Sequence, residues 1–221
     1  MAPKEIVFTK EQVVNAAFDV VREQGIGALS ARKVAEHLGS STAPVYSWFS
    51  SMHELGEAVA RKTHDLLLEY TRKPYTPRVD LNIGVGIVLF ARDHPKLFTT
   101  VHTEGKEAYD ADNELQEYLL KQLKPLSDYQ NMTDEDIRTL FNKFKIFSHG
   151  LALLACSHQL PYDSDDFIIY IFWECGEELI EAAQKKTTHK DEYTFVHGLK
   201  VHKDKIQQLS QWRKKQHLAT E

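Results

Sequence analysis

The segment LSARKVAEHLGSSTAPVYSWFSSMHEL, residues 29–55, carries the signals of two short helices joined by a glycine-containing turn. Ser30 is expected to cap the first helix, because its hydroxyl can accept a hydrogen bond from an unpaired backbone N–H. Gly39 can adopt the left-handed conformation that ends a helix. Ser41 is expected to cap the second helix, with Pro44 in the first turn, where a missing N–H does no harm.

A helix, a turn and a second short helix have the geometry of a helix-turn-helix motif, in which the second helix enters the major groove of DNA. Val45 and Phe49 can anchor that helix to its domain, and the Tyr46 hydroxyl can donate to a phosphate. Three positions are small enough to allow a close approach to DNA: Thr42, Ala43 and Ser47. Because the same pattern also occurs as a plain corner of all-α proteins, it does not decide the function by itself.

Helix signals continue on both sides of this segment. Thr9 and Gln12 form a predicted capping box that opens a helix, and this helix stops at Gly25. Ser51 and Glu54 form a second predicted box that opens a long helix. Further helices are expected at residues 79–93, 95–103, 107–124, 133–158, 163–186 and 200–217. The sequence therefore predicts an all-α protein, with a helix-turn-helix domain at residues 1–50 and a second helical domain at residues 51–221.

The segment from Phe8 to Ala60 resembles the DNA-binding domain of the TetR family of bacterial transcriptional repressors. The resemblance lies in the paired alanines of the first helix, the glycine that ends it, the LSARKVAEHLG run, and Val45-Tyr46-x-x-Phe49 before HEL. It implies that bases are faced by Arg32, Thr42, Ala43 and Pro44, and that phosphates are held by Ser30, Lys33 and Tyr46. Ser47 belongs to the same implied DNA-binding surface, and so does Trp48, which stands where the family often has an aromatic residue or a histidine.

Two features depart from that family. A lysine that grips a phosphate is common at the start of the fourth helix, and Met52 stands there in this chain. Residues 1–65 carry seven Lys and Arg against eight Asp and Glu, so DNA affinity would depend on a few positioned contacts and on helix N-termini. Residues 66–184 are acidic, with 11 Lys and Arg against 20 Asp and Glu, whereas residues 185–221 are basic, with nine against four.

The resemblance also implies that the chain from about residue 66 onward binds a small-molecule effector and forms a homodimer through its last two long helices. The fragments FARDHPKLF, residues 90–98, and FSHGLALL, residues 147–154, are similar to recurring pieces of such domains. The candidate effector contacts are Phe90, Phe98, His102, Tyr118, Phe147 and His149, with Phe144 and Trp173 as further aromatic candidates. Aromatic residues at helical spacing are also typical of a plain core, and that alternative stays open.

Two interpretations of His149 and Gly150 are left open. A glycine within a helical run costs about 1 kcal/mol relative to alanine, which points to a close neighbour or a local bend. His149 is either a core histidine bonded to a nearby carbonyl, with Gly150 allowing tight helix packing, or a contact to the effector. A haem or metal ligand is a special case of the second interpretation. Cys156 and His158 are poor partners for one ion, because residues two apart point to different sides of a helix.

Composition and missing motifs narrow the function further. The formal net charge of −5 argues against a general polyanion binder. There is no apolar run like that of a signal peptide or membrane span, and the two cysteines form no CxxC pair, so a cytoplasmic protein without membrane contact is expected. The sequence lacks a nucleophile elbow, a P-loop, a dinucleotide fingerprint and HExxH, so we expect no enzymatic activity, no cofactor and no resident metal.

The predicted function is that of a ligand-responsive transcriptional repressor. It would bind a palindromic double-stranded DNA operator as a homodimer and be released when an effector changes the spacing of the two recognition helices. One alternative is a repressor on the same scaffold that senses haem or a metal ion. The other is a helical binding module without specific DNA recognition, which the near-neutral N-terminal part and Met52 favour.

Overall fold

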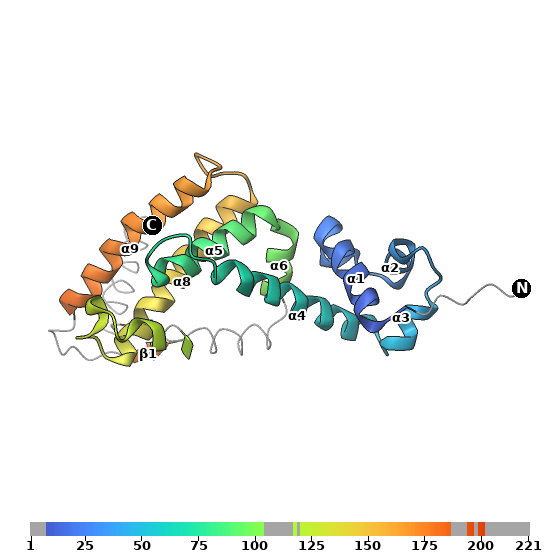
Figure 1. Cartoon of the computed structure of the whole chain (residues 1–221), viewed down its shortest axis with the longest axis horizontal. Helices are drawn as coiled ribbons and strands as arrows, with labels where there is room; N and C mark the ends of the chain where they lie inside the picture. Colours follow the sequence, from blue (N-terminus) through green and yellow to red (C-terminus); the bar gives the residue numbers. More distant parts are fainter. Residues whose placement is uncertain (1–7, 104–116, 119, 187–193, 197–198, 202–221) are drawn as a thin grey trace, which may run out of the picture.

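A computed structural model describes residues 8–103, 117–118, 120–186, 194–196 and 199–201 of the chain. This part is helical except for one short hairpin, which confirms the all-α class predicted from the sequence. Figure 1 shows an elongated arrangement, with three N-terminal helices at one end, the last long helix at the other, and a 20-residue helix leading from the N-terminal group into the rest.

The N-terminal group consists of α1 (Lys10–Gln24), the 3₁₀ turn η1 (Ile26–Ala28), α2 (Ala31–Leu38) and α3 (Ala43–Trp48). The chain continues through α4 (Met52–Thr71), α5 (Val79–Asp93), α6 (Pro95–Thr103), the 3₁₀ turn η2 (Ser127–Tyr129), α8 (Asp134–Cys156) and α9 (Asp165–Lys186). The strands β1 (Thr194–Val196) and β2 (Leu199–Val201) pair antiparallel, with Phe195 opposite Lys200.

Most expected helices are confirmed. Those at 79–93 and 95–103 have the predicted bounds, and α8 and α9 are slightly shorter than predicted. Within the helix expected at 107–124, residues 117–118 and 120–123 are helical, and residues 107–116 and 119 lie outside the described part. The start of the helix expected at 200–217 is wrong, because Lys200 and Val201 belong to β2, where β-branched neighbours favour an extended backbone. Residues 202–217 of that helix lie outside the described part as well.

Local capping determines where the first helices begin and end. Thr9 and Gln12 form the predicted capping box, and the Ser30 hydroxyl accepts from the Lys33 N–H at 3.4 Å. Gly39 closes α2 in the left-handed conformation, with φ 63°, which a side chain would strain. These signals act over three or four residues, so the sequence is sufficient to locate them.

Two predicted caps differ in detail. Thr42, not Ser41, is the N-cap of α3, and the Ser41 hydroxyl instead accepts from the Ala43 N–H at 3.4 Å. Pro44 lies in the first turn as expected. At the start of α4 the Ser51 hydroxyl accepts from the Glu54 N–H, but the Glu54 carboxylate accepts from the N–H of Ser50 and not of Ser51, so the predicted reciprocal box is wrong by one residue.

The core runs without interruption from the N-terminal helices into the rest of the chain. Val13, Val34 and Val45 are buried from α1, α2 and α3, and α4 packs against both α1 and α5. Residues 80–91 of α5 are all buried, so α5 is the central helix around which α4, α8 and α9 pack. The domain boundary expected at residue 50 stays a prediction, since α4 joins the two groups. None of the described helices combines the length and apolar character that a membrane crossing requires.

The packing of α4 on α5 depends on a glycine. A Cβ added at Gly86 would lie 2.5 Å from the carbonyl oxygen of Tyr70 and 2.7 Å from the Cα of Thr71. Both neighbouring atoms belong to the backbone of the last turn of α4, so no side-chain rotation could relieve the overlap. Gly86 therefore sets the distance at which the end of α4 crosses α5.

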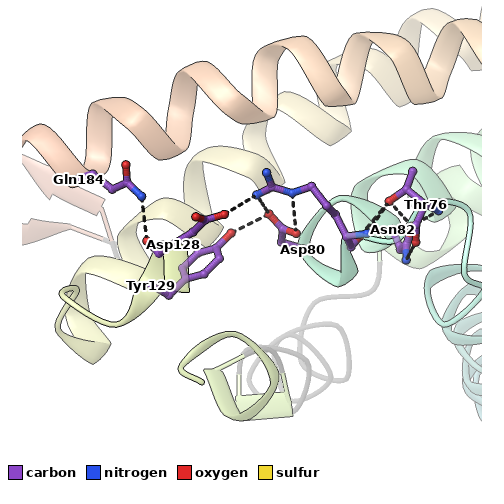
Figure 2. A network of polar contacts seen from close by, with 7 residues as sticks. Thr76, Asp80, Asn82, Asp128, Tyr129 and Gln184 are labelled. Atoms are coloured by element: carbon purple, nitrogen blue, oxygen red, sulfur yellow. Dashed lines mark hydrogen bonds and ion pairs between the residues drawn. The ribbon is translucent and has the colours of Figure 1, made fainter. Parts of the chain in front are cut away.

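A buried polar network fixes the start of α5 (Figure 2). The Asp80 carboxylate accepts from the Arg78 guanidinium at 2.7 and 3.3 Å and from the Tyr129 hydroxyl at 2.6 Å. Arg78 also lies 3.7 Å from Asp128, whose carbonyl oxygen accepts from the Gln184 amide at 3.0 Å. The network thus joins α5, η2 and the end of α9. Burial, together with the adjacent Asp80 carboxylate, raises the pKa of Tyr129, so its hydroxyl stays protonated and donates.

Candidate nucleic-acid interface and effector region

The exposed side of α3 carries the predicted reading residues. Val45 and Phe49 point inward and are 1% and 2% exposed, as their proposed anchoring role requires. Tyr46 is 59% exposed, and four further residues at or near the start and middle of the helix are exposed: Ser41, Thr42, Ala43 and Ser47. Pro44 is half-buried. The helix therefore presents one surface of small polar groups plus a phenol, and no charged side chain lies within it.

The candidate residues of α2 are already engaged by neighbours. Arg32 is exposed and forms an i,i+4 ion pair with Glu36 at 2.9 Å, and the Lys33 ammonium donates to the Gln24 side chain at 2.6 Å. Exposed pairs of this kind contribute little free energy, so either cation could exchange its partner for a phosphate. The Ser30 hydroxyl accepts the capping bond, which leaves its own proton for donation.

Trp48 has a role that the sequence did not reveal. Its indole N–H donates a 2.8 Å hydrogen bond to the carbonyl oxygen of Phe8, 40 residues earlier in the chain. The ring is nevertheless 45% exposed. The indole donor is thus engaged within the protein, and the Ser47 hydroxyl likewise donates to the Pro44 carbonyl at 2.8 Å.

The start of α4 is weakly charged. Met52 is half-buried against the core, so it does not offer the cation that the TetR resemblance places there. His53 is exposed and lies 3.5 Å from Glu57. Lys10, from the first turn of α1, places its ammonium 5.1 Å from the centroid of the Phe49 ring and supplies positive charge beside this helix start.

The predicted effector contacts are only partly brought together. Phe90 and Phe98 are 0% and 2% exposed and belong to the continuous core. The Phe98 ring lies 6.1 Å from the His149 ring, whereas Phe147 packs edge-on against Phe172 and Tyr118 is 44% exposed. Of the further aromatic candidates, Phe144 is buried and Trp173 is partly exposed. His102 belongs to the last turn of α6, and its side chain lies outside the described residues.

His149 is tied to its own helix. Its Nδ1 lies 2.7 Å from the carbonyl oxygen of Lys145, and because a carbonyl only accepts, Nδ1 carries the proton of this bond. This is the carbonyl-bonded histidine of the first interpretation. Within the chain no helix packs closely on Gly150, because it is exposed and a Cβ there would have no heavy atom within 4 Å, so close packing at Gly150 against another copy stays a prediction.

The described residues give no support to a metal centre. They contain no group of three or more His, Cys, Asp or Glu side chains placed to hold an ion. The Cys156 thiol donates to the Ala91 carbonyl at 3.3 Å, and burial raises the pKa of both cysteine thiols. Both thiols therefore stay protonated at neutral pH.

Sequence reasoning missed a polar cluster where α4, α5 and α6 meet. The Tyr70 hydroxyl donates to Asp93 at 3.0 Å and lies 3.3 Å from Nε2 of His94, and its ring packs edge-on against Phe90. Burial lowers the pKa of His94 and raises the pKa of Tyr70 to about 12. Lys96, two residues on in α6, donates to the carbonyl of Glu23 in α1. The helix break at His94-Pro95 was the only signal of this cluster in the sequence.

The last two long helices, through which the resemblance implies dimerisation, carry exposed apolar side chains. The α8 side chains Ile146, Leu153 and Leu154 are 61%, 60% and 42% exposed. The α9 side chains Tyr170 and Trp173 are 57% and 37% exposed. We call these five residues the α8–α9 surface. Ile146 precedes Leu153 and Leu154 by seven and eight positions, and Tyr170 precedes Trp173 by three, which places them along one side of each helix.

Comparison with known proteins identifies the fold of the chain through solved structures. No protein-family model and no curated protein sequence matches the chain. Among solved structures, a candidate transcriptional regulator from Streptomyces coelicolor is similar, with a TM-score of 0.51 and 17% identity over 80% of this chain and 97% of that one. A TetR variant from Acinetobacter baumannii in complex with minocycline has a TM-score of 0.52 and 13% identity over 86% of this chain and 100% of that one. The chain has a TetR-type fold. An N-terminal helix-turn-helix and a C-terminal helical body, both expected from the sequence, are the parts of a TetR-type fold.

Proposed function

We propose that the chain is a transcriptional repressor that recognises a specific double-stranded DNA sequence through α3. The observation that carries the proposal is the division of α3 into a buried side, Val45 and Phe49, and an exposed side with Thr42, Ala43 and Tyr46. Small residues allow the helix to approach base edges, and the tyrosine hydroxyl can reach a phosphate. The TetR-type fold supports the same function, because one of the similar structures is named as a transcriptional regulator and another is a TetR variant.

The proposed contacts divide into two groups. Arg32 and the start of α3, residues 42–44, would face bases, whereas Ser30, Lys33 and Tyr46 would hold phosphates. With few cations near α3, each phosphate contact should contribute noticeably to the dependence of affinity on salt. Ser47 and Trp48 lie on the same exposed side, but the Ser47 hydroxyl and the Trp48 indole N–H already donate to the carbonyl oxygens of Pro44 and Phe8.

We further propose that the repressor is a homodimer joined through the α8–α9 surface. Five large apolar side chains exposed on two adjacent helices are more than single scattered surface residues, and a second copy would bury them. Exposed Gly150 lies between Ile146 and Leu153 along α8, where the absence of a side chain would let a facing helix approach. Two recognition helices on one dimer would read the two halves of a palindrome.

The regulatory part of the proposal is a small-molecule effector bound by the helical body of α5 to α9. The similar structure from Acinetobacter baumannii is a complex with minocycline, which supports a small organic ligand as the class of effector here. Two of the candidate contacts are Phe98 in α6 and His149 in α8, whose ring centroids lie 6.1 Å apart. To release the operator, the effector must bind the two conformations with different affinity.

A mobility-shift assay tests the DNA-binding function. The probe is the duplex upstream of the protein's own gene, titrated between about 50 and 200 mM salt with an unrelated duplex as competitor. We expect a specific complex with the wild type and its loss in Ala43→Glu, which places a negative charge on the exposed start of α3. Gln122→Glu adds the same charge at an exposed position outside the first four helices and should bind as the wild type does. Absence of a specific complex at every salt concentration would leave a helical binding module without DNA recognition.

A further inference from the structure

The recognition helix α3 is too short to hold its own direction. It has six residues, and Thr42 at its N-cap makes no side-chain capping bond. Isolated helices below about 12 residues are marginal in water, so the direction of α3 depends on its contacts with the rest of the N-terminal group. Val45 and Phe49 supply the apolar part of those contacts.

The start of α1 contacts the C-terminal end of α3 at two points. The Trp48 indole N–H donates to the Phe8 carbonyl at 2.8 Å, and the Lys10 ammonium lies 5.1 Å from the Phe49 ring centroid. Phe8 packs against the core and directly precedes Thr9, the N-cap of α1, so the accepting carbonyl is attached to the start of a capped helix. We call Phe8, Lys10, Trp48 and Phe49 the brace. Figure 1 shows α1 and α3 side by side at this end of the molecule, in agreement with their direct contacts.

We propose that the brace holds α3 at the angle at which it reads DNA, and that Trp48 is a positioning residue whose indole N–H acts through Phe8 and not through the DNA. The proposal rests on the DNA-binding function proposed above. A hydrogen bond at the last residue of a short helix restrains rotation of the whole helix about its buried anchors. Without this bond, α3 populates other orientations, and the apparent affinity falls with the fraction that remains competent.

Loss of the brace and loss of a direct contact to DNA should affect binding in different ways. Base readout requires a fixed angle of α3 in the groove, whereas phosphate contacts to unrelated DNA tolerate several angles. Loss of the brace should therefore weaken binding to a preferred sequence and leave binding to unrelated DNA unchanged. Loss of a phosphate contact weakens binding to both, and also lowers the salt dependence.

The test uses the full-length protein and two duplexes of equal length. One is the sequence that the wild type enriches from a random pool, and the other is an unrelated sequence. Trp48→Phe keeps an aromatic ring but removes the donor, and we expect about fivefold weaker binding to the enriched duplex, the effect of one hydrogen bond, with an unchanged affinity for the unrelated duplex and an unchanged salt slope. Tyr46→Phe is the contrasting variant and should weaken binding to both duplexes.

Equal affinity of Trp48→Phe and the wild type for the enriched duplex would overturn the proposal, and so would an equal loss on both duplexes. If Trp48→Phe does not fold, 3-benzothienylalanine at position 48 replaces the N–H by sulfur at nearly the same volume, and the same selective loss is expected. If the wild type enriches no sequence, the DNA-binding function fails and the brace fails with it. If the wild type enriches a sequence and Trp48→Phe binds it with the same affinity as the wild type, only the proposal for the brace is refuted and the DNA-binding function stands.

Discussion

The Tyr129 hydroxyl donates a 2.6 Å hydrogen bond to the carboxylate of Asp80, 49 residues earlier in the chain. Asp80 lies in the first turn of the central helix α5 and is only 9% exposed, and Tyr129 is 1% exposed. This contact, with the ion pair between Arg78 and Asp80, attaches the turn before α8 to the helix around which the body packs. A buried carboxylate of this kind costs free energy unless its hydrogen bonds are complete.

Tyr129→Phe should lower the free energy of unfolding by about 2 kcal/mol, because it removes one of the two donors to Oδ2 of the buried Asp80 carboxylate and leaves that oxygen with the Arg78 guanidinium alone. Urea denaturation followed by circular dichroism measures the change. Tyr162→Phe, at a 67% exposed site, is the matched control and should alter the free energy of unfolding by less than about 0.5 kcal/mol. A loss in Tyr129→Phe no larger than in this control would show that the network does not stabilise the fold.

Gly86→Ala should destabilise the chain by about 3 kcal/mol or prevent folding, since the added Cβ would overlap the backbone of Tyr70 and Thr71. Gly27→Ala serves as the control, because a Cβ there has no heavy atom within 4 Å. Thermal unfolding of the two variants gives the comparison. Equal melting temperatures would mean that α4 and α5 can separate without cost.

These two sites show where sequence reasoning ends. The caps at Thr9, Ser30 and Gly39 were predicted because each depends on residues three or four positions away. Gly86 and Tyr129 owe their importance to partners 16 and 49 positions away, which no local pattern indicates. The aromatic candidates illustrate the same limit. Helical spacing identified Phe90 as an inward residue, but it could not show that its surroundings are core.

His94 should make the fold sensitive to mild acid. Burial lowers the pKa of His94 from the ordinary value of 6.5. The Asp93 carboxylate opposes this shift and the Arg22 cation adds to it, and the net direction is downward. As the pH falls below 6.5, the unfolded chain takes up a proton that the folded chain resists, so stability decreases. In His94→Gln, the loss of unfolding free energy between about pH 7.5 and 5.5 should be smaller than in the wild type. Urea denaturation at the two pH values measures this loss. An identical loss in the two proteins would exclude His94 as a source of the acid sensitivity.

Leu153→Glu should convert the proposed dimer into a monomer, because it places a charge within the α8–α9 surface. Leu153 is 60% exposed within the chain, so the fold of each monomer should be retained. Sedimentation velocity gives the mass of both proteins, and circular dichroism checks the helix content. Gln159→Glu adds the same charge at an exposed residue beyond the end of α8 and should stay dimeric. A wild type that sediments as a monomer would remove the dimer from the account.

The site could be predicted more fully at the DNA end than at the effector end. Val45, Phe49 and Tyr46 were placed correctly on the buried and exposed sides of α3, since one turn of helix determines which side each residue occupies. Trp48 was assigned to the DNA surface, and its bond to Phe8 could not be foreseen from residues 40 positions apart. Whether the candidate effector contacts come together depends on how α5, α6 and α8 pack, and this packing is set by contacts distant in sequence.

The central claim is that two copies of α3 read a specific DNA sequence, and selection from a pool of random duplexes tests it most directly. The full-length wild type, at about 0.15 M salt, should enrich a palindrome whose half-sites are centred about 10 base pairs apart or a multiple of that distance. Ala43→Glu should enrich none. If the wild type enriches no sequence over the starting pool, the account of this chain as a DNA-reading repressor is contradicted.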